Sequence, residues 1–243
     1  MNDELILSWK NSTTHMWVPV GRLKFKNNHY FFQYTKGAEN SKEFKPFEKM
    51  DDLNKIYESE DLFPLFQNRL LQKSRPEYKE YLDWLDISAN DMHPMEELSL
   101  TGGVRATDSL QLFPIPREKS GYYEVKFFSH GIRYLAQSYK KRADKLENGD
   151  KLYIMKDIQN SYDKFALTLR TEDPPELVGY CPKNYVKDFN SLIDKNGAEN
   201  IEVSVVKNNK TAPSQLKLLC KFKAKWYEGF KAFSDDEFQT IRK

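Results

Sequence analysis

Two short stretches in the second half of the chain combine aromatic side chains with charged and polar ones. The first is Arg133 with Tyr134, and the second holds Asn160, Tyr162, Asp163 and Lys164. Aromatic faces stack on nucleobases of any sequence, and Arg and Lys hold phosphates through charge-assisted hydrogen bonds. A lone carboxylate such as Asp163 repels phosphate, but it can accept a hydrogen bond from the free 3′-hydroxyl of a strand end. These residue types therefore predict a site for single-stranded nucleic acid.

The second stretch also fits a purely structural role. Asn160 and Asp163 are residues that bond their own backbone in tight turns. From the residue types alone, a turn and a nucleic-acid contact remain alternatives.

Residue spacing argues against a complete active site. The four histidines, His15, His29, His93 and His130, lie far apart, and no HExxH, GxSxG, GxxxxGK[ST] or GxGxxG motif occurs. Cys181 precedes Pro182 at a predicted helix start and is expected to be structural, because no partner base is visible. We predict a protein that is not an enzyme and has no cofactor and no metal site. An enzyme using Asp163 with a nearby lysine is the least favoured alternative.

Composition indicates a folded protein that does not span a membrane. Apolar residues make up 39% of the chain, which is enough for an ordinary core, and only two cysteines occur. The N-terminal sequence lacks the charge and apolar run of a signal peptide, and no stretch approaches the roughly 18 apolar residues of a membrane span. A cytoplasmic location is expected.

Charge is unevenly distributed along the chain. The net charge is +2, but residues 1–117 hold 15 basic against 18 acidic residues (−3), and residues 118–243 hold 23 against 18 (+5). A basic half favours contact with a polyanion. Ordinary variation in surface charge explains the difference equally well.

The pattern of elements predicts an α+β fold with two small domains, residues 1–117 and 118–243. Pro114, Pro116 and Gly121 mark a linker between them. The first domain should hold a β-hairpin over residues 17–34, in an antiparallel sheet, followed by three helices that begin after Ser59 and at Pro76 and Pro94. The second should hold six short strands near residues 123–127, 151–155, 165–169, 176–180, 201–206 and 216–222, a helix from Pro182 to Gly197, and a terminal helix from Ser234.

Three motifs in the second domain resemble the HIRAN domain. They are GIRY at residues 131–134, NSYDKFAL at 160–167, which has Ser161 where the family has proline, and VGYCPK at 178–183. The resemblance implies a compact β-barrel-like domain with helices that binds DNA ends. It implies that Arg133, Tyr134, Tyr162 and Asp163 hold the terminal nucleotides and the 3′-hydroxyl. Asn160, Lys164, Tyr180 and Lys183 complete the predicted site.

The first domain is similar to the N-terminal subdomain of HipA-like toxin kinases. The likeness rests on VGRL at residues 20–23, FFQY at 31–34 and LFPLFQNRLL at 62–71, with Gln72-Lys73 where that family has P-E-G. The kinase core is missing, so the likeness implies docking of a partner protein rather than phosphoryl transfer.

We therefore predict a non-enzymatic DNA-binding adaptor. Its second domain would bind single-stranded DNA or a 3′ end, while its first domain docks a HipA-like kinase or a DNA-processing enzyme. The alternative is a toxin–antitoxin or phage-defence regulator that acts mainly through protein contact with a HipA-like kinase.

Overall fold

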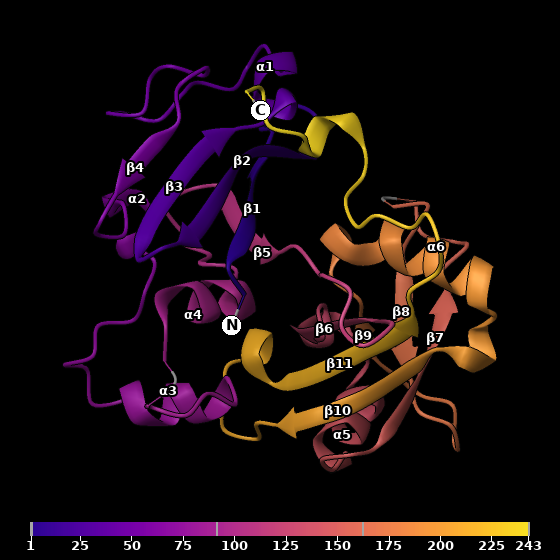
Figure 1. Ribbon diagram of the computed structural model, residues 1–243. Helices are drawn as coiled ribbons and strands as arrows, with labels where there is room; N and C mark the ends of the chain where they lie inside the picture. The colour runs from indigo at the N-terminus through magenta and orange to yellow at the C-terminus, as the bar shows by residue number, and fades with distance from the viewer. Residues whose placement is uncertain (1, 91, 162, 243) are drawn as a thin grey trace. The chain divides into compact units, whose positions relative to one another are not determined.

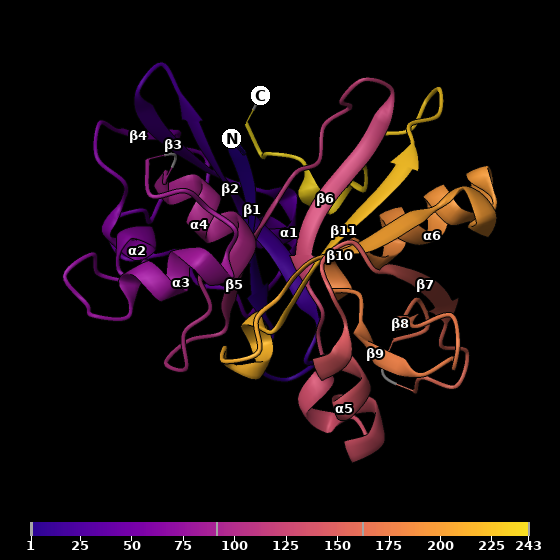
Figure 2. The same cartoon turned by 90° about the horizontal axis from the view of Figure 1, so that it is seen from below.

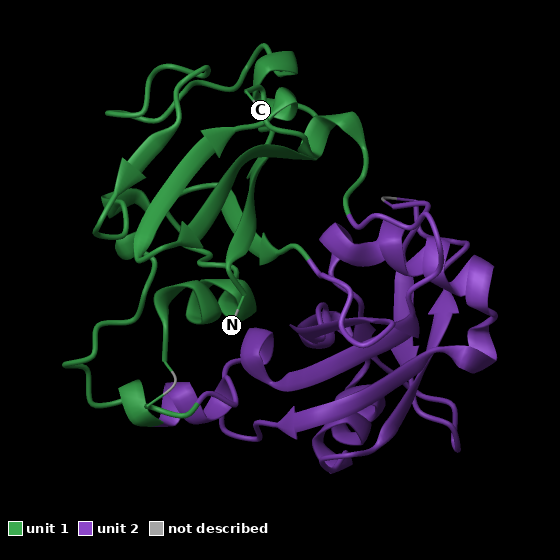
Figure 3. Ribbon diagram, viewed as in Figure 1, with its two compact units in different colours: residues 1–79, 88–115, 233–243 green, residues 80–87, 116–232 purple. Residues whose placement is uncertain are grey.

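The structure is a computed structural model, and it describes every residue except 1, 91, 162 and 243. The chain forms two compact units (Figure 3): unit 1 comprises residues 1–79, 88–115 and 233–243, and unit 2 comprises residues 80–87 and 116–232. The chain crosses between the units at residues 79/80, 87/88, 115/116 and 232/233, and the third of these crossings lies close to the expected linker. The domain limits 1–117 and 118–243 stay a prediction.

Unit 1 is built on a five-stranded antiparallel sheet in the order β4-β3-β2-β1-β5 (Figure 1). Its strands are β1 (Glu4–Lys10), β2 (Trp17–Lys26), β3 (His29–Tyr34), β4 (Tyr57–Ser59) and β5 (Leu110–Pro114). The predicted hairpin is present as β2 and β3. Asn27 and Asn28 form its turn with φ of 51° and 64°, the left-handed conformation that two-residue hairpin turns need and that Asn tolerates.

Strand β5 corrects the expectation that Pro114 lies in a linker. Pro114 pairs with Leu5 of β1 and ends the edge strand of the sheet. A proline that cannot donate a backbone hydrogen bond is tolerated on an edge strand, so β5 includes Pro114 and the crossing to unit 2 follows at residues 115 and 116.

The helices of the first half are short. They are α1 (Lys36–Asn40), α2 (Pro64–Gln67), α3 (Tyr78–Trp84) and α4 (Pro94–Thr101). Helix α4 begins and ends as predicted, because His93 caps its first turn and Gly102 ends it in the left-handed region at φ 70°. The terminal α-helix from Ser234 is wrong: Asp236–Phe238 form one 3-10 turn, and Thr240 then makes a bridge with Thr35.

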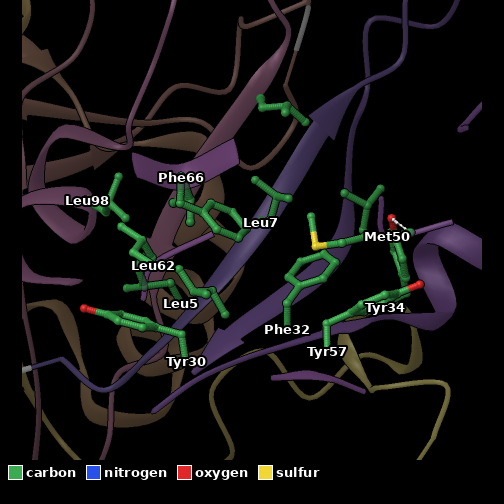
Figure 4. Close-up of a cluster of buried hydrophobic side chains, with 14 of the residues drawn as sticks. Leu5, Leu7, Tyr30, Phe32, Tyr34, Met50, Tyr57, Leu62, Phe66 and Leu98 are labelled. Carbon is green, nitrogen blue, oxygen red and sulfur yellow. Dashed lines mark hydrogen bonds between the residues drawn. The ribbon is translucent and has the colours of Figure 1, made fainter. Parts of the chain in front are cut away.

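Aromatic and aliphatic side chains from all five strands, from helices α2 and α4 and from the loops fill the core of unit 1 (Figure 4). The Tyr34 hydroxyl donates to the Met50 carbonyl at 2.6 Å and accepts from the Phe47 amide at 2.8 Å. Burial raises the pKa of Tyr34 to about 12, so this core hydroxyl stays neutral and keeps both bonds.

Unit 2 is built on a six-stranded antiparallel sheet in the order β6-β11-β10-β7-β8-β9, curled into a half-barrel (Figure 2). Its strands are β6 (Tyr122–Phe128), β7 (Lys151–Lys156), β8 (Leu167–Arg170), β9 (Leu177–Tyr180), β10 (Glu202–Asn208) and β11 (Leu218–Lys225). All six lie close to the predicted ranges, because each alternates apolar and polar residues or is short and wholly apolar.

Two helices accompany this sheet, and one was not predicted. Helix α6 (Val186–Asn196) follows Pro182 and ends before Gly197, as expected, and its Phe189 ring stacks on Phe222 of β11 with centroids 3.9 Å apart. Helix α5 (Gln137–Lys145) was not predicted, because Ala143 is its one buried residue and a single apolar position does not produce a helical repeat in the sequence.

No helix in the described part of the chain is long and apolar enough to cross a membrane.

Candidate nucleic-acid interface

The two edges of the half-barrel meet at one backbone bridge. β6 and β9 are the outer strands of the sheet. His130, just after β6, and Tyr180, the last residue of β9, exchange backbone hydrogen bonds of 2.9 Å in both directions. We call residues 129–134 and 177–183 together the seam. It brings the first and third predicted motifs side by side.

Two glycines allow this close approach. A Cβ on Gly179 would lie 1.8 Å from Ser129 Oγ and 2.8 Å from the His130 carbonyl oxygen, and Gly179 has a φ of 138°. A Cβ on Gly131, at φ 75°, would lie 3.1 Å from Cδ2 of Tyr180. The Gly131 backbone therefore rests against the Tyr180 ring, which fixes where the following residues emerge.

Those residues are Arg133 and Tyr134, on the 3-10 turn Ile132–Tyr134 (η1). Ile132 is buried and anchors the turn, whereas Tyr134 is 77% exposed. The Arg133 guanidinium carbon lies 4.6 Å from the centre of the Tyr134 ring, a cation–π contact. The turn thus presents an aromatic face and a cation to solvent.

The loop between β7 and β8 is tied to the seam by Asp157. Its backbone amide donates to the Ala166 carbonyl at 2.9 Å, which closes the neck of the loop. Its Oδ2 accepts from Tyr180 Oη at 3.2 Å and from Asn160 Nδ2 at 3.1 Å. Burial, and secondarily the charge of Asp157, raises the pKa of Tyr180, which keeps this hydroxyl a donor.

The turn alternative for the second motif is found in the structure. Asn160 Oδ1 accepts from the Asp163 amide at 3.0 Å, and Asp163 Oδ1 accepts from the Phe165 amide at 2.9 Å. A carboxylate has about four acceptor positions, so a half-buried Asp163 that shapes the loop can still accept a further hydrogen bond. The predicted contact residue Tyr162 lies outside the described residues.

The remaining predicted cations are exposed. Lys164 lies in the loop with its Nζ 5.0 Å from the Phe165 ring centre, and Lys183, the last residue of the seam, begins a 3-10 turn. The structure thus joins Asn160 to Tyr180 through Asp157 and sets Arg133 and Tyr134 beside Tyr180. In the described residues, no hydrogen bond or ion pair joins Lys164, or the seam residue Lys183, to these side chains.

Sequence reasoning missed Asp157 and three exposed apolar side chains near it. Ile158 is 90% exposed, Met155 46% and Phe165 37%. Single exposed apolar residues are ordinary, but these three belong to one short hairpin. An isoleucine inside the polar run Asp-Ile-Gln-Asn was the sequence signal that could have marked this loop.

Cys181 is buried and burial raises the pKa of its thiol well above the usual value, so it is a poor nucleophile. Among the residues that the structure describes, no three His, Cys, Asp or Glu side chains are grouped as metal ligands.

A half-barrel whose edges meet beside exposed aromatic and basic side chains defines a small binding domain of the α+β class. The family model of the HIRAN domain matches residues 122–227. Residues 122–227 are therefore a HIRAN domain, as their three motifs predicted.

Two crystal structures are similar to part of this chain, and in each case the similarity covers nearly the whole of the other protein's chain. A protein from Lactobacillus plantarum is 18% identical over 43% of this chain and 99% of its own, with a TM-score of 0.33. The HIRAN domain of human HLTF is 16% identical over 47% of this chain and 98% of its own, with a TM-score of 0.34. A search of curated proteins found no match. The likeness of the first half to HipA-like kinases stays a prediction.

Proposed function

We propose that the HIRAN domain of this chain binds single-stranded DNA at a free 3′ end, and that the chain acts as a non-enzymatic adaptor. The seam carries the proposal, because it brings two separate segments side by side, and Asp157 ties the loop that holds Asp163 to it. Tyr134 would stack on a terminal base, Arg133 and Lys183 would contact phosphates, and Asp163 would accept a hydrogen bond from the 3′-hydroxyl.

The test compares strands that differ only at the 3′ end. The full chain is titrated with a labelled single strand that carries either a 3′-hydroxyl or a 3′-phosphate. We expect the hydroxyl strand to bind more tightly, because a phosphate would place negative charge against Asp163. Equal affinities would remove Asp163 from the site, and no affinity for either strand at low salt would refute DNA binding.

The stacking contact is tested separately. Tyr134→Ala should weaken binding by about 1–3 kcal/mol, the usual range for one stacked base. Tyr122→Ala is the matched control, because Tyr122 is also an exposed tyrosine of the same unit, 39% accessible, but lies on β6 before the seam begins. Equal losses from both variants would contradict the assignment of Tyr134.

Unit 1 is proposed to dock a partner protein, either a HipA-like kinase or a DNA-processing enzyme. Support comes from large apolar side chains that unit 1 exposes, Met16 at 54%, Ile56 at 43% and Val104 at 63%. Replacing all three by Ser should abolish co-purification with such a kinase and leave DNA binding unchanged. If protein contact is the main role, the biological activity should survive Tyr134→Ala and be lost in the triple variant.

Absence of enzymatic activity is part of the proposal. Incubation with labelled single-stranded and duplex DNA and Mg²⁺ should leave both intact. Cleavage that Asp163→Asn abolishes would assign a nuclease instead.

A further inference from the structure

Helix α5 starts three residues after Tyr134 and is held firmly in unit 2. Ala143 is fully buried, and the Asn208 side chain donates to the carbonyls of Ala143 at 2.9 Å and Leu146 at 2.7 Å. The residue before Ala143, Arg142, donates to the Asp173 carbonyl at 3.0 Å. These contacts fix which face of α5 turns toward solvent.

The solvent face carries a stripe of three residues spaced one turn apart, which we call the α5 stripe: Gln137, Lys141 and Lys145. All three are exposed, as residues at i, i+4 and i+8 on one face should be. Since the stripe begins at Gln137, it starts directly beyond the turn that presents Tyr134.

The two lysines of the stripe have no carboxylate partner in the described part of the chain. The acidic residue of this helix, Asp144, is paired with Lys217, and Arg142 lies near Glu176. Like charges at i and i+4 repel each other. The negative end of the helix favours Lys145 in the last turn, but Lys141 lies one turn earlier, where this effect has faded. A bound polyanion would therefore offset the repulsion between Lys141 and Lys145 and stabilise both charges.

We propose that the α5 stripe binds the phosphates of the strand whose end the seam holds. This inference rests on the proposed function and adds the path of the strand: from the base stacked on Tyr134, the backbone would run along α5. Lys141 and Lys145 are separated by about 6 Å along the helix axis, from a rise of 1.5 Å per residue, so each can contact its own phosphate. Binding should then depend on strand length.

The experiment measures affinity against salt for two lengths of thymidine strand with a free 3′-hydroxyl. One has about four nucleotides, enough for the seam, and the other about twelve, within the span of small single-strand binding domains. The full chain is compared with Lys141→Gln/Lys145→Gln, a change that keeps good helix formers. The control is Lys42→Gln/Lys45→Gln, which removes two exposed lysines from unit 1.

We expect the wild type to bind the long strand more tightly than the short one. The α5 variant should lose roughly tenfold in affinity for the long strand at low salt, and its plot of log affinity against log salt should be shallower by about 1.4, from about 0.7 per phosphate contact on a single strand. Its affinity for the short strand should change less than about twofold, and the control variant should behave like the wild type.

Each other outcome overturns a defined part. Equal wild-type affinities for the two lengths, or an unchanged salt slope in the α5 variant, refute the α5 path and leave the seam intact. A parallel loss for both lengths, or the same loss in the control, shows a general charge effect and also refutes it. If the wild type binds neither strand, the proposed function itself fails.

Discussion

The Tyr180 hydroxyl lies 3.2 Å from Oδ2 of Asp157, which ties the last residue of β9 to the first residue of the loop between β7 and β8. The same oxygen accepts from Asn160 Nδ2, and the Tyr180 ring rests against Gly131. The side chain of Tyr180 therefore spans from the turn that presents Tyr134 to the loop that holds Asp163. Asp157 sets the spacing between these groups, and its Oδ2 already accepts two hydrogen bonds from the protein itself.

Asp157→Ala should weaken DNA binding even though it removes a negative charge from a basic surface. The variant loses two side-chain hydrogen bonds to a carboxylate, each of which contributes about 1.5–3 kcal/mol, and the loop is no longer held to Tyr180. Binding of a 3′-hydroxyl strand, measured by anisotropy, should fall, and the chain should unfold at a lower urea concentration.

Glu228→Ala supplies the control, because it removes one exposed negative charge from unit 2 and should leave affinity unchanged or slightly increased. Tighter binding by Asp157→Ala would mean that its charge matters more than its hydrogen bonds.

The difference between what could and could not be predicted has a physical basis. The exposed residues Arg133 and Tyr134 belong to a short motif that can be recognised from neighbouring positions in the sequence. Asp157 acts through Tyr180, 23 positions further on, and only the folded sheet brings the two together. Helix α5 could not be predicted from the sequence for a related reason. It is held in place by hydrogen bonds from Asn208 rather than by an apolar face, so its own sequence shows no helical repeat of apolar residues.

Gly179→Ala should destabilise the chain by about 2–4 kcal/mol. The new Cβ meets Ser129 Oγ and the His130 carbonyl oxygen, which adds an overpacking cost of about 1–3 kcal/mol to a backbone strain of at least about 1 kcal/mol at a φ that glycine adopts readily and alanine does not. The measurement is urea unfolding followed by circular dichroism.

Gly149→Ala separates these two causes. Gly149 also has a positive φ, 94°, but a Cβ added there would meet nothing within 4 Å, so this variant carries the strain alone. Equal costs for the two glycines would mean that the seam opens freely to admit a methyl group.

Asp108→Ala should destabilise unit 1 by about 2–4 kcal/mol. The Arg69 side chain is 1% exposed, and its Nη2 lies 2.6 Å from Asp108 Oδ2, so the change leaves a buried charge without its partner. Arg69 keeps its bonds to the carbonyls of Leu65 and Gly103, which places the cost below the upper end of the range for broken buried pairs. Asp194→Ala breaks a pair of similar length, Asp194 with Lys156 at 2.8 Å, whose side chains are 63% and 51% exposed. It should cost less than about 1 kcal/mol. Comparable losses would show that burial does not decide the strength of these pairs.

The cap of helix α4 predicts a loss of stability in mild acid. His93 Nδ1 accepts from the Met95 amide at 3.2 Å, which requires the neutral ring, and burial lowers the pKa of His93 from its ordinary value of 6.5. A histidine whose folded pKa is lowered contributes its full stability above the unfolded pKa and loses it as the pH falls through the folded pKa. The free energy of unfolding should therefore decrease as the pH is lowered past about 6.5. The decrease should be at most the contribution of a helix cap, about 0.5–2 kcal/mol.

His93→Asn keeps a capping oxygen that does not titrate, so subtracting its pH profile from that of the wild type isolates His93 from the other three histidines. Parallel profiles of the two proteins from pH 7.5 down to about pH 5 would show that the His93 cap does not titrate with folding.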